Sequence, residues 1–377
     1  MNSSEQRARR LVEHSGEHPV ISLYLDLDPD TFATPPARAS QIRSLIDEGT
    51  RTVENDQQLG HEDRAGLRAD LKRIEEFLHS PEAPFQGARA LAVFCSSADG
   101  LFEAVQLSRP VTGRLLIGRS PYVEPLLEGA QRRRWLVALV SRGSAQLWAG
   151  SPGRLRQQER LQDGVHGQHD QGGWSQARYE RSVEKEVEDH LRQFAEAVER
   201  RWRAERFDRL ALGGPQEIVP RFQELLSQDL LAHLASERVR VDLSSAGQAD
   251  VLEAVERVAE EDERRTEREA LDRMDEGVAG AGRATRGLKD TVLALNERRV
   301  EQLLIDPGLA GQGRRCPTCG LLMGGQEESC PADGTPTTEL DLREAVVEAA
   351  LIQDAEVTVI RHHEDLRQAG IGALLRF

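Results

Sequence analysis

The sequence predicts an α/β protein built from three domains. Short runs rich in Leu, Val and Ala alternate with longer segments whose apolar residues recur at helical spacing, and this alternation favours partly parallel sheets covered by helices. The chain has 377 residues, which is more than one ordinary domain contains. Its 38% hydrophobic and 30% charged residues are typical of a folded, water-soluble protein.

The first domain, residues 1–121, is expected to be a sheet with helices on one side. Its first strand is closed by Asp28-Pro29, and Cys95 ends a later apolar strand as a core residue. The predicted strands are 20–27, 88–94 and 101–107, and the predicted helices are 37–53 and 62–78.

The second domain, residues 122–249, begins with a hairpin and continues as an α/β unit. A polar stretch rich in Gln, His and Gly, residues 157–171, separates the hairpin from a long charged helix. The predicted strands are 135–140, 145–148, 209–212 and 239–243, and the predicted helices are 182–206 and those within 218–235.

The third domain, residues 250–377, opens with an acidic helix that contains many arginines and links it to the second domain. It continues in α-β-insert-α-β order, with an insert at 314–338 that contains three cysteines. The predicted helices are 250–280, 287–296 and 342–353, and the predicted strands are 299–307, 355–360 and 372–377.

Composition excludes several classes of protein. No apolar run approaches the roughly 18–20 residues that a membrane helix needs, and the polar start Met1–Glu13 lacks a signal-peptide core. The four cysteines, three of them clustered, do not suggest a disulfide framework, so we expect a cytoplasmic protein without a membrane partner. The formal net charge of −15 argues against nucleic-acid affinity of the whole surface, although a local basic face could still bind phosphate.

The most informative segment is a glycine pair, Gly172-Gly173, followed by Trp174-Ser175-Gln176 and the long charged helix. Adjacent glycines let the backbone take positive φ and approach another molecule closely. A glycine tip on a helical stem can deliver one side chain into a confined site. Gln176 is the candidate side chain, because it lies three positions after Gly173, at the head of the helix.

Arginine clusters supply candidate contacts to RNA. One cluster precedes an apolar strand and others lie on the long helix, where solvated helix and strand ends are an equally good interpretation. Trp174 could stack on a base. The predicted RNA-binding residues are Trp174, Arg178, Arg181, Arg132, Arg133 and Arg134.

The insert carries two Cys-Pro-x-Cys-Gly-like turns, the second with aspartate in the place of its second cysteine. Each such turn directs two ligands at one tetrahedral ion, so the pattern indicates a short zinc ribbon. A structural zinc is the favoured interpretation; an empty vestigial knuckle and a catalytic zinc with an open position are the alternatives. The predicted ligands are Cys316, Cys319, Cys330 and Asp333.

Two other features are weaker. A literal Gly-Gly-Gln at Gly324-Gly325-Gln326 lies between the cysteine turns with no helix after it, and we interpret it as a turn of the ribbon. His166 and His169 have no partner at a spacing that would make a metal or acid–base site. The chain contains no nucleophile elbow, phosphate loop or dinucleotide-binding fingerprint.

Gly172, Gly173, Ser175, Arg178 and Tyr179, with the helix that follows, resemble the Gly-Gly-Gln loop of archaeo-eukaryotic class I release factors. Leu288–Pro307 resembles the start of their third domain, a fold shared with Pelota and kink-turn-binding ribosomal proteins. The cysteine-bearing insert and residues 355–377 resemble the bacterial branch of that superfamily. The resemblance runs from about Tyr122 to the C-terminus, and no Asn-Ile-Lys-Ser motif for reading stop codons is present.

This resemblance implies a ribosome-associated factor with the ribosome and tRNA as partners and a translational GTPase as a further candidate. Trp174 stands where the family has its glutamine, but Gly173-Trp174-Ser175-Gln176 matches the Gly-x-x-Gln form of the eukaryotic ribosome quality-control peptidyl-tRNA hydrolase. The implied catalytic residues are Gly172, Gly173 and Gln176. The expected activity is stop-codon-independent hydrolysis of peptidyl-tRNA on stalled ribosomes; the alternative is a non-catalytic A-site factor for rescue or hibernation.

Overall fold

The computed structural model describes residues 3–13, 18–28, 34–56, 59–85, 88–107, 110–130, 133–152, 154–162, 176–243, 245–280 and 282–377. Its contacts divide the chain into two compact units: unit 1 comprises Met1–Gln131 with Ala270–Phe377, and unit 2 comprises Arg132–Glu269. Helices and sheets build both units, which confirms the predicted α/β class. The finer division into three domains stays a prediction.

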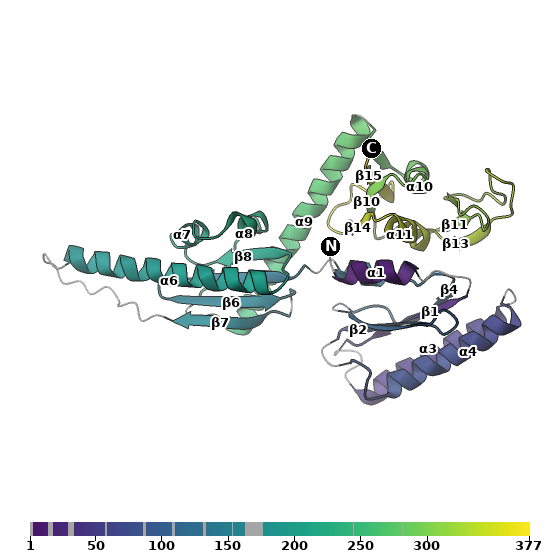
Figure 1. Cartoon of the computed structure of the whole chain (residues 1–377), viewed down its shortest axis with the longest axis horizontal. Helices are drawn as coiled ribbons and strands as arrows, with labels where there is room; N and C mark the ends of the chain where they lie inside the picture. Colours follow the sequence, from purple (N-terminus) through teal and green to yellow (C-terminus); the bar gives the residue numbers. More distant parts are fainter. Residues whose placement is uncertain are drawn as a thin grey trace. The chain divides into compact units, whose positions relative to one another are not determined.

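The N-terminal part of unit 1 is an antiparallel sheet in the order β3-β2-β1-β4. Successive side chains of β1 point to opposite faces of the sheet. Ile21 and Leu23 pack in the core beneath α3 and α4. Val20 and Tyr24 pack on the opposite face with α1 and α5. Figure 1 shows the two long helices covering one face of this sheet and α1 covering the other. The elements are α1 (Ser3–Glu13), β1 (Val20–Asp26), α3 (Pro35–Asn55), α4 (His61–His79), β2 (Ala90–Ser96), β3 (Leu101–Leu107), β4 (Arg114–Gly118) and α5 (Glu124–Ala130).

The C-terminal part of unit 1 is a second sheet, in the order β14-β10-β15-β9. One face packs on α10 and α11 and shares a continuous apolar core with α1, while the other face packs on Leu271 and Met274 of α9. A separate three-stranded sheet, β12-β11-β13, forms the insert. The elements are the end of α9 (Gln248–Ala279), β9 (Ala284–Arg286), α10 (Leu288–Asn296), β10 (Val300–Ile305), β11 (Gln312–Arg315), β12 (Leu322–Met323), β13 (Thr338–Asp341), α11 (Leu342–Ile352), β14 (Glu356–Val359) and β15 (Ile371–Leu375).

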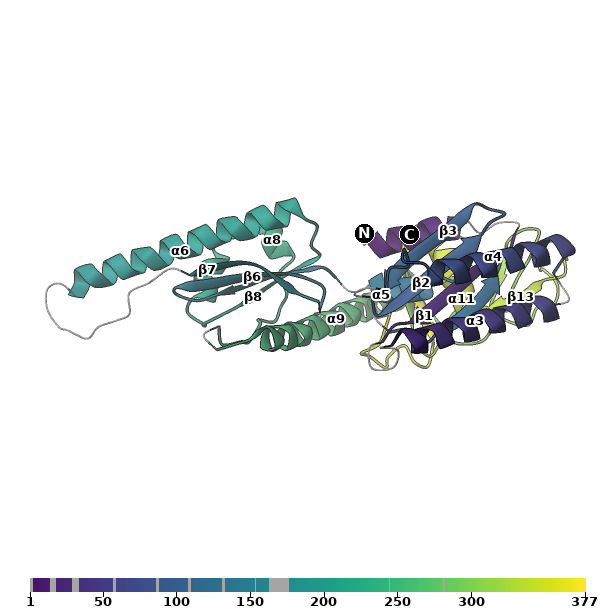
Figure 2. The same ribbon diagram turned by 90° about the horizontal axis from the view of Figure 1, so that it is seen from below.

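Unit 2 is a sheet in the order β7-β6-β5-β8, in which β5 and β8 run parallel and the other pairs are antiparallel. The parallel pair requires a crossover, which the long helix α6 supplies. Figure 2 shows α6 and the first part of α9 on opposite faces of this sheet. The elements are β5 (Trp135–Val140), β6 (Ser144–Gly150), β7 (Arg156–Gln162), α6 (Gln176–Ala204), β8 (Arg209–Gly213), α7 (Val219–Gln223) and α8 (Gln228–Ala232).

Three local expectations need correction. Helix α1 lies within the segment that the sequence marked only as a polar start, and β7 occupies the beginning of the polar stretch 157–171. The predicted strand 239–243 contributes a single parallel bridge, from Val239 to Gly213. Among the residues that the structure describes, no helix is long and apolar enough to cross a membrane.

Candidate functional site

Helix α6 is held to unit 2 by its second half. Val187, Leu191, Phe194 and Val198 are at most 1% exposed and recur on one face of the helix, which packs in the core over β5 and β6. Phe194 stacks on Phe222 of α7, with ring centroids 5.3 Å apart. The helix is therefore a rigid stem, anchored from Val187 onward.

The first turns of α6 carry the predicted catalytic end. The helix begins at Gln176, and Arg181, Glu184 and Lys185 are exposed ahead of Val187, the first buried residue among the described side chains of the helix. Gly172, Gly173 and Trp174 lie outside the described residues, as do the side chains of Gln176 and Arg178. The start of the helix, and with it the position of Gln176, thus precedes the buried stretch of the stem. The catalytic and RNA-binding assignments at this end stay predictions.

The basic segment before β5 is tied into unit 2 itself. The backbone N–H of Arg134 donates to Asp208 (2.6 Å), and its guanidinium pairs with Glu205 and lies 5.1 Å from the centre of the Phe207 ring. These contacts fasten the end of α6 to the start of β5. Arg132 lies outside the described residues. RNA binding by Arg134 stays a prediction, but it would compete with these intramolecular partners.

Arg133 belongs to a cluster around Asp262 of α9. The Asp262 carboxylate accepts hydrogen bonds from three arginines: Arg133 at 2.6 Å, Arg209 at 2.8 Å and Arg265 at 2.8 Å. The Asp262 side chain is only 1% exposed. Burial alone would raise the pKa of Asp262, but hydrogen bonds from Arg209 and Arg265 outweigh it and lower that pKa. The cluster pins α9 to the sheet, which is a structural role for Arg133.

The insert of unit 1 brings the four predicted metal ligands together. One ligand atom from each of Cys316, Cys319, Cys330 and Asp333 lies within 4.8 Å of all the others. The Sγ atoms of Cys319 and Cys330 are 3.5 Å apart, and Cys316 Sγ is 3.5 Å from a carboxylate oxygen of Asp333. Tetrahedral ligands of zinc lie about 3.5–3.8 Å from one another. The donor set and its spacing therefore fit one such ion.

The two turns that hold these ligands have the same geometry. In each, the glycine that follows the second ligand has positive φ, 76° at Gly320 and 74° at Gly334, and its N–H donates to the carbonyl of the first ligand, Cys316 or Cys330. A backbone N–H also points at the first thiol of each turn, from Cys319 in one and Ala332 in the other. Because only glycine takes this φ without strain, the Cys-Pro-x-x-Gly pattern fixes both turns locally.

Electrostatics favour anionic ligands in this cluster. The backbone N–H of Thr335 donates to the Asp333 carboxylate at 2.9 Å and lowers its pKa to about 2. Although burial opposes ionisation of Cys316, N–H groups of Cys319 and Thr318 lower the pKa of its thiol. A backbone N–H favours the Cys319 thiolate as well, yet hydrogen bonding to Cys316 prevails and raises the pKa of Cys319 to about 11. Ionisation is therefore favoured at Asp333 and Cys316 and disfavoured at Cys319.

The insert is attached to unit 1 by specific contacts. The side-chain amide of Asn296, at the end of α10, donates to the carbonyl of Leu322 at 2.8 Å and accepts from its N–H at 2.9 Å. Arg315 of β11 pairs with Glu348 of α11 at 2.9 Å. Gln326 is exposed on the loop after β12, with no helix following it within the insert, which agrees with its interpretation as a turn residue.

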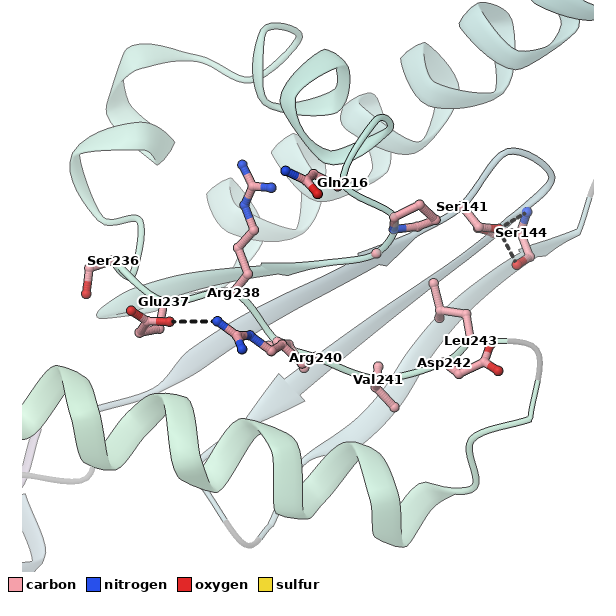
Figure 3. A pocket seen from close by; sticks show the side chains of 13 residues that line it. Ser141, Ser144, Gln216, Ser236, Glu237, Arg238, Arg240, Val241, Asp242 and Leu243 are labelled. Atoms are coloured by element: carbon pink, nitrogen blue, oxygen red, sulfur yellow. Dashed lines mark hydrogen bonds and ion pairs between the residues drawn. The ribbon is translucent and has the colours of Figure 1, made fainter.

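Unit 2 also has a pocket that the sequence did not indicate. Its volume is about 820 Å³, and it lies where the parallel strands β5 and β8 end, lined by Ser141, Ser144, residues 214–216 and residues 236–243. Figure 3 shows Arg238 and Gln216 extending on the same side, while Arg240 pairs with Glu237 at 4.0 Å. In the sequence, the feature that could have indicated this pocket is the Gly213-Gly214-Pro215 turn, which follows a strand. Because its two arginines are balanced by Glu237 and Asp242, the pocket shows no preference for a charged ligand.

The comparisons relate part of the chain to a known family. Residues 121–260, which include all of β5–β8 and α6, match the model of bacterial archaeo-eukaryotic release factor family 10. The chain is therefore similar to that family over residues 121–260. It is 28% identical over 209 residues to peptide chain release factor subunit 1 of Methanopyrus kandleri, an alignment that covers 53% of this chain and 50% of that protein. The chain thus matches about half the length of this curated relative.

The comparisons with solved structures include two that are each less than 20% identical to this chain. The archaeal translation termination factor aRF1 is 19% identical, with 99% of this chain and 98% of that chain covered and a TM-score of 0.29. A structure described as a model of ribosome-bound archaeal Pelota and ABCE1 is 18% identical, with coverage of 76% and 77% and a TM-score of 0.41. With both TM-scores below 0.5, neither structure establishes a common full-length arrangement.

Proposed function

We propose that this protein is a cytoplasmic translation factor that enters the ribosome and hydrolyses the ester of peptidyl-tRNA on stalled ribosomes, independently of a stop codon. The family match of residues 121–260 supports a release-factor-like role. The ribosome and tRNA are its proposed partners, and a translational GTPase is a proposed delivery partner.

The proposed reaction is attack of water on the ester carbonyl that joins the nascent peptide to the terminal adenosine of tRNA. Gln176 is the proposed catalytic residue, because a glutamine amide both donates and accepts a hydrogen bond and so can orient a water molecule without carrying a charge into the site. Gly172 and Gly173 are proposed to let the backbone approach the substrate closely. A backbone N–H near the developing oxyanion would stabilise it.

One observation carries this proposal. Helix α6 begins at Gln176, and among its described side chains the first buried one is Val187, so the proposed catalytic residue heads a stem that is packed in the core from Val187 onward. A rigid stem limits the orientations of the group at its end and so lowers the entropy lost in reaching the reactive geometry. The proposed RNA contacts on or near this stem are Trp174, Arg178 and Arg181.

A second candidate function is occupation of the ribosomal A site without catalysis, in rescue or hibernation. Trp174 favours it, because this residue stands directly after the glycine pair, where the release-factor pattern has glutamine, and an indole cannot orient water in the same way. The net charge of −15 also fits a factor that docks through a limited face rather than a generally cationic enzyme of RNA.

We propose a structural zinc for the cysteine cluster. Cys316, Cys319, Cys330 and Asp333 would hold it, and three thiolates with one carboxylate suit zinc better than magnesium or calcium. When bound, the ion would link the two turns of the insert covalently. No step of the proposed hydrolysis uses this site.

The decisive experiment measures peptide release from purified stalled ribosomes that carry labelled peptidyl-tRNA. Wild-type protein is expected to release peptide, and Gln176→Ala should lower the rate on the order of 10²–10³-fold while ribosome binding is unchanged, because a positioned polar group is lost and the stem is kept. Gln326→Ala is the matched control, since the same amide is removed from the exposed loop of the insert, and it should release peptide at the wild-type rate.

The outcomes separate the two candidate functions. Tight ribosome binding by wild type without any peptide release would replace hydrolysis by the non-catalytic A-site role. Absence of ribosome binding would overturn both. Release that survives Gln176→Ala would leave hydrolysis standing and remove Gln176 from it.

A further inference from the structure

The thiols of the cysteine insert differ in access to solvent. Cys319 is exposed, whereas Cys316 is 1% exposed and Cys330 is 3% exposed. A small oxidant in solution therefore reaches the sulfur of Cys319 first. Cys95, the fourth cysteine of the chain, is fully buried in strand β2 and is shielded from the same oxidant.

Cys330, a thiol neighbour of Cys319, is placed to complete a disulfide. Its Sγ lies 3.5 Å from that of Cys330, so the sulfurs need approach by only about 1.5 Å to reach the length of a disulfide bond. Both cysteines sit on turns, which shift more easily than residues inside a sheet or helix. Cys316 contacts the Asp333 carboxylate through its Sγ, at 3.5 and 3.6 Å, in addition to its hydrogen bond with Cys319.

From this arrangement we propose that Cys319 and Cys330 are an oxidation site that hydroperoxides convert to a disulfide. The Cys319 sulfur attacks one peroxide oxygen as its proton is transferred to the departing oxygen, the O–O bond breaks, and Cys319 becomes a sulfenic acid while water leaves. The Cys330 sulfur then attacks the Cys319 sulfur, the disulfide forms and water leaves. In total, two thiols and one hydrogen peroxide give one disulfide and two waters.

The disulfide would also control metal retention, a consequence that rests on the proposed zinc site. It removes two of the four donors and leaves Cys316 with Asp333, and two ligands are too few to hold zinc. Because the fourth donor is a carboxylate rather than a thiolate, the remaining pair is weaker than in an all-cysteine ribbon. Metal in the insert would thus depend on the oxidation state of the chain.

The test treats the full-length protein with increasing hydrogen peroxide and follows two independent readouts. Free thiols, counted under denaturing conditions, should fall from four to two, and peptide mapping by mass spectrometry should link Cys319 to Cys330 with Cys95 unmodified. Zinc released into a chromogenic chelator should appear with the same dependence on peroxide. Cys319→Ser should slow thiol loss on the order of tenfold, because the exposed sulfur is absent.

Matched variants keep the test decisive. Cys330→Ser should leave Cys319 without its partner, so that peroxide drives Cys319 to sulfinic acid instead of a disulfide. A disulfide between Cys316 and either partner, or oxidation of Cys95 before Cys319, would overturn the proposal. If the Cys319–Cys330 disulfide forms in protein that never contained zinc, the oxidation site stands and the metal proposal fails, so the two failures are distinguishable.

Discussion

The two sites to which the chemistry of this chain points are built in opposite ways. The cysteine insert is closed on itself, because its four donor groups approach within 4.8 Å through bonds made inside two short turns. Near the start of α6, the described side chains of Arg181, Glu184 and Lys185 are exposed, and they precede the buried residues that begin at Val187. The four proposed ligands of the insert are thus brought together within the chain, whereas the catalytic role of the start of α6 stays a proposal.

The largest effect is expected on zinc binding, when one of the four proposed ligands of the cysteine insert is removed. Protein purified without chelator should hold one equivalent of zinc, and Cys316→Ser should lower the affinity by about two orders of magnitude or more, because a buried thiolate ligand is removed. Elemental analysis and zinc titration measure both. Cys95→Ala is the matched control, since it removes a buried cysteine of the other sheet in unit 1 and should leave zinc unchanged.

Asp333→Cys sharpens the same prediction. A thiolate should bind zinc more tightly than the carboxylate it replaces, so this variant should gain affinity if Asp333 occupies the fourth position. Wild-type protein that holds no zinc and an insert that is equally stable in Cys316→Ser would instead identify the turns as a metal-free remnant.

The next effect is expected on the stability of unit 2, when a buried residue that anchors α6 is truncated. Phe194→Ala should destabilise unit 2 by about 3–5 kcal/mol, because a fully buried ring that stacks on Phe222 is replaced by a cavity. All four tryptophans of the chain, Trp135, Trp148, Trp174 and Trp202, belong to unit 2, so urea unfolding followed by tryptophan fluorescence reports on this unit alone.

Lys185→Ala is the control for this anchor. Lys185 is exposed on the first turns of the same helix, and its loss should change stability by no more than about 0.5 kcal/mol. An equal loss of stability in Lys185→Ala and Phe194→Ala would show that α6 is packed as firmly around Lys185 as in its second half. The proposed difference between the two halves of the helix would then be wrong.

The sequence predicted elements best where a local pattern decides the structure. The cysteine turns are an example, since glycine after the second ligand and the ligand spacing are both local. Helices α3, α4 and α9 also follow their apolar periodicity. The same reasoning found the start of the long helix too late, at Ser182, whereas the helix begins at Gln176.

Elements that depend on a distant partner were missed. Strand β7 has the sequence Arg-Gln-Gln-Glu-Arg-Leu-Gln and pairs at the edge of its sheet, where charged side chains are tolerated and an apolar alternation is not required. Helix α1 was missed because its few apolar residues, Ala8, Leu11 and Val12, find their core only in unit 1 as a whole. The partners of Arg133 and Arg134 are equally remote in sequence, at Asp262 and Glu205.

The smallest effect concerns a carboxyl group beside the closed site. Glu344, in the first turn of α11, has a pKa raised from 4.5 to about 7, first by burial and then by the charges of Asp341 and Glu348, against the opposing charges of Arg114 and Arg315. Because the folded-state value lies above the unfolded one, the protonated form stabilises the fold. That stability is complete below about pH 4.5 and is lost as the pH rises through 7.

Glu344→Gln should therefore stabilise unit 1 at pH 8 by on the order of 1–3 kcal/mol and leave its stability at pH 4 nearly unchanged, since glutamine resembles the protonated acid. Unfolding in urea followed by far-ultraviolet circular dichroism measures this change, and tryptophan fluorescence recorded in the same samples serves as the control, because unit 2 should not respond. A loss of stability at pH 8 would mean that the ionised carboxylate is held by Arg114 and Arg315. The junction between β11 and α11 would then depend on that charge, and the insert would not be a site fixed by its own turns alone.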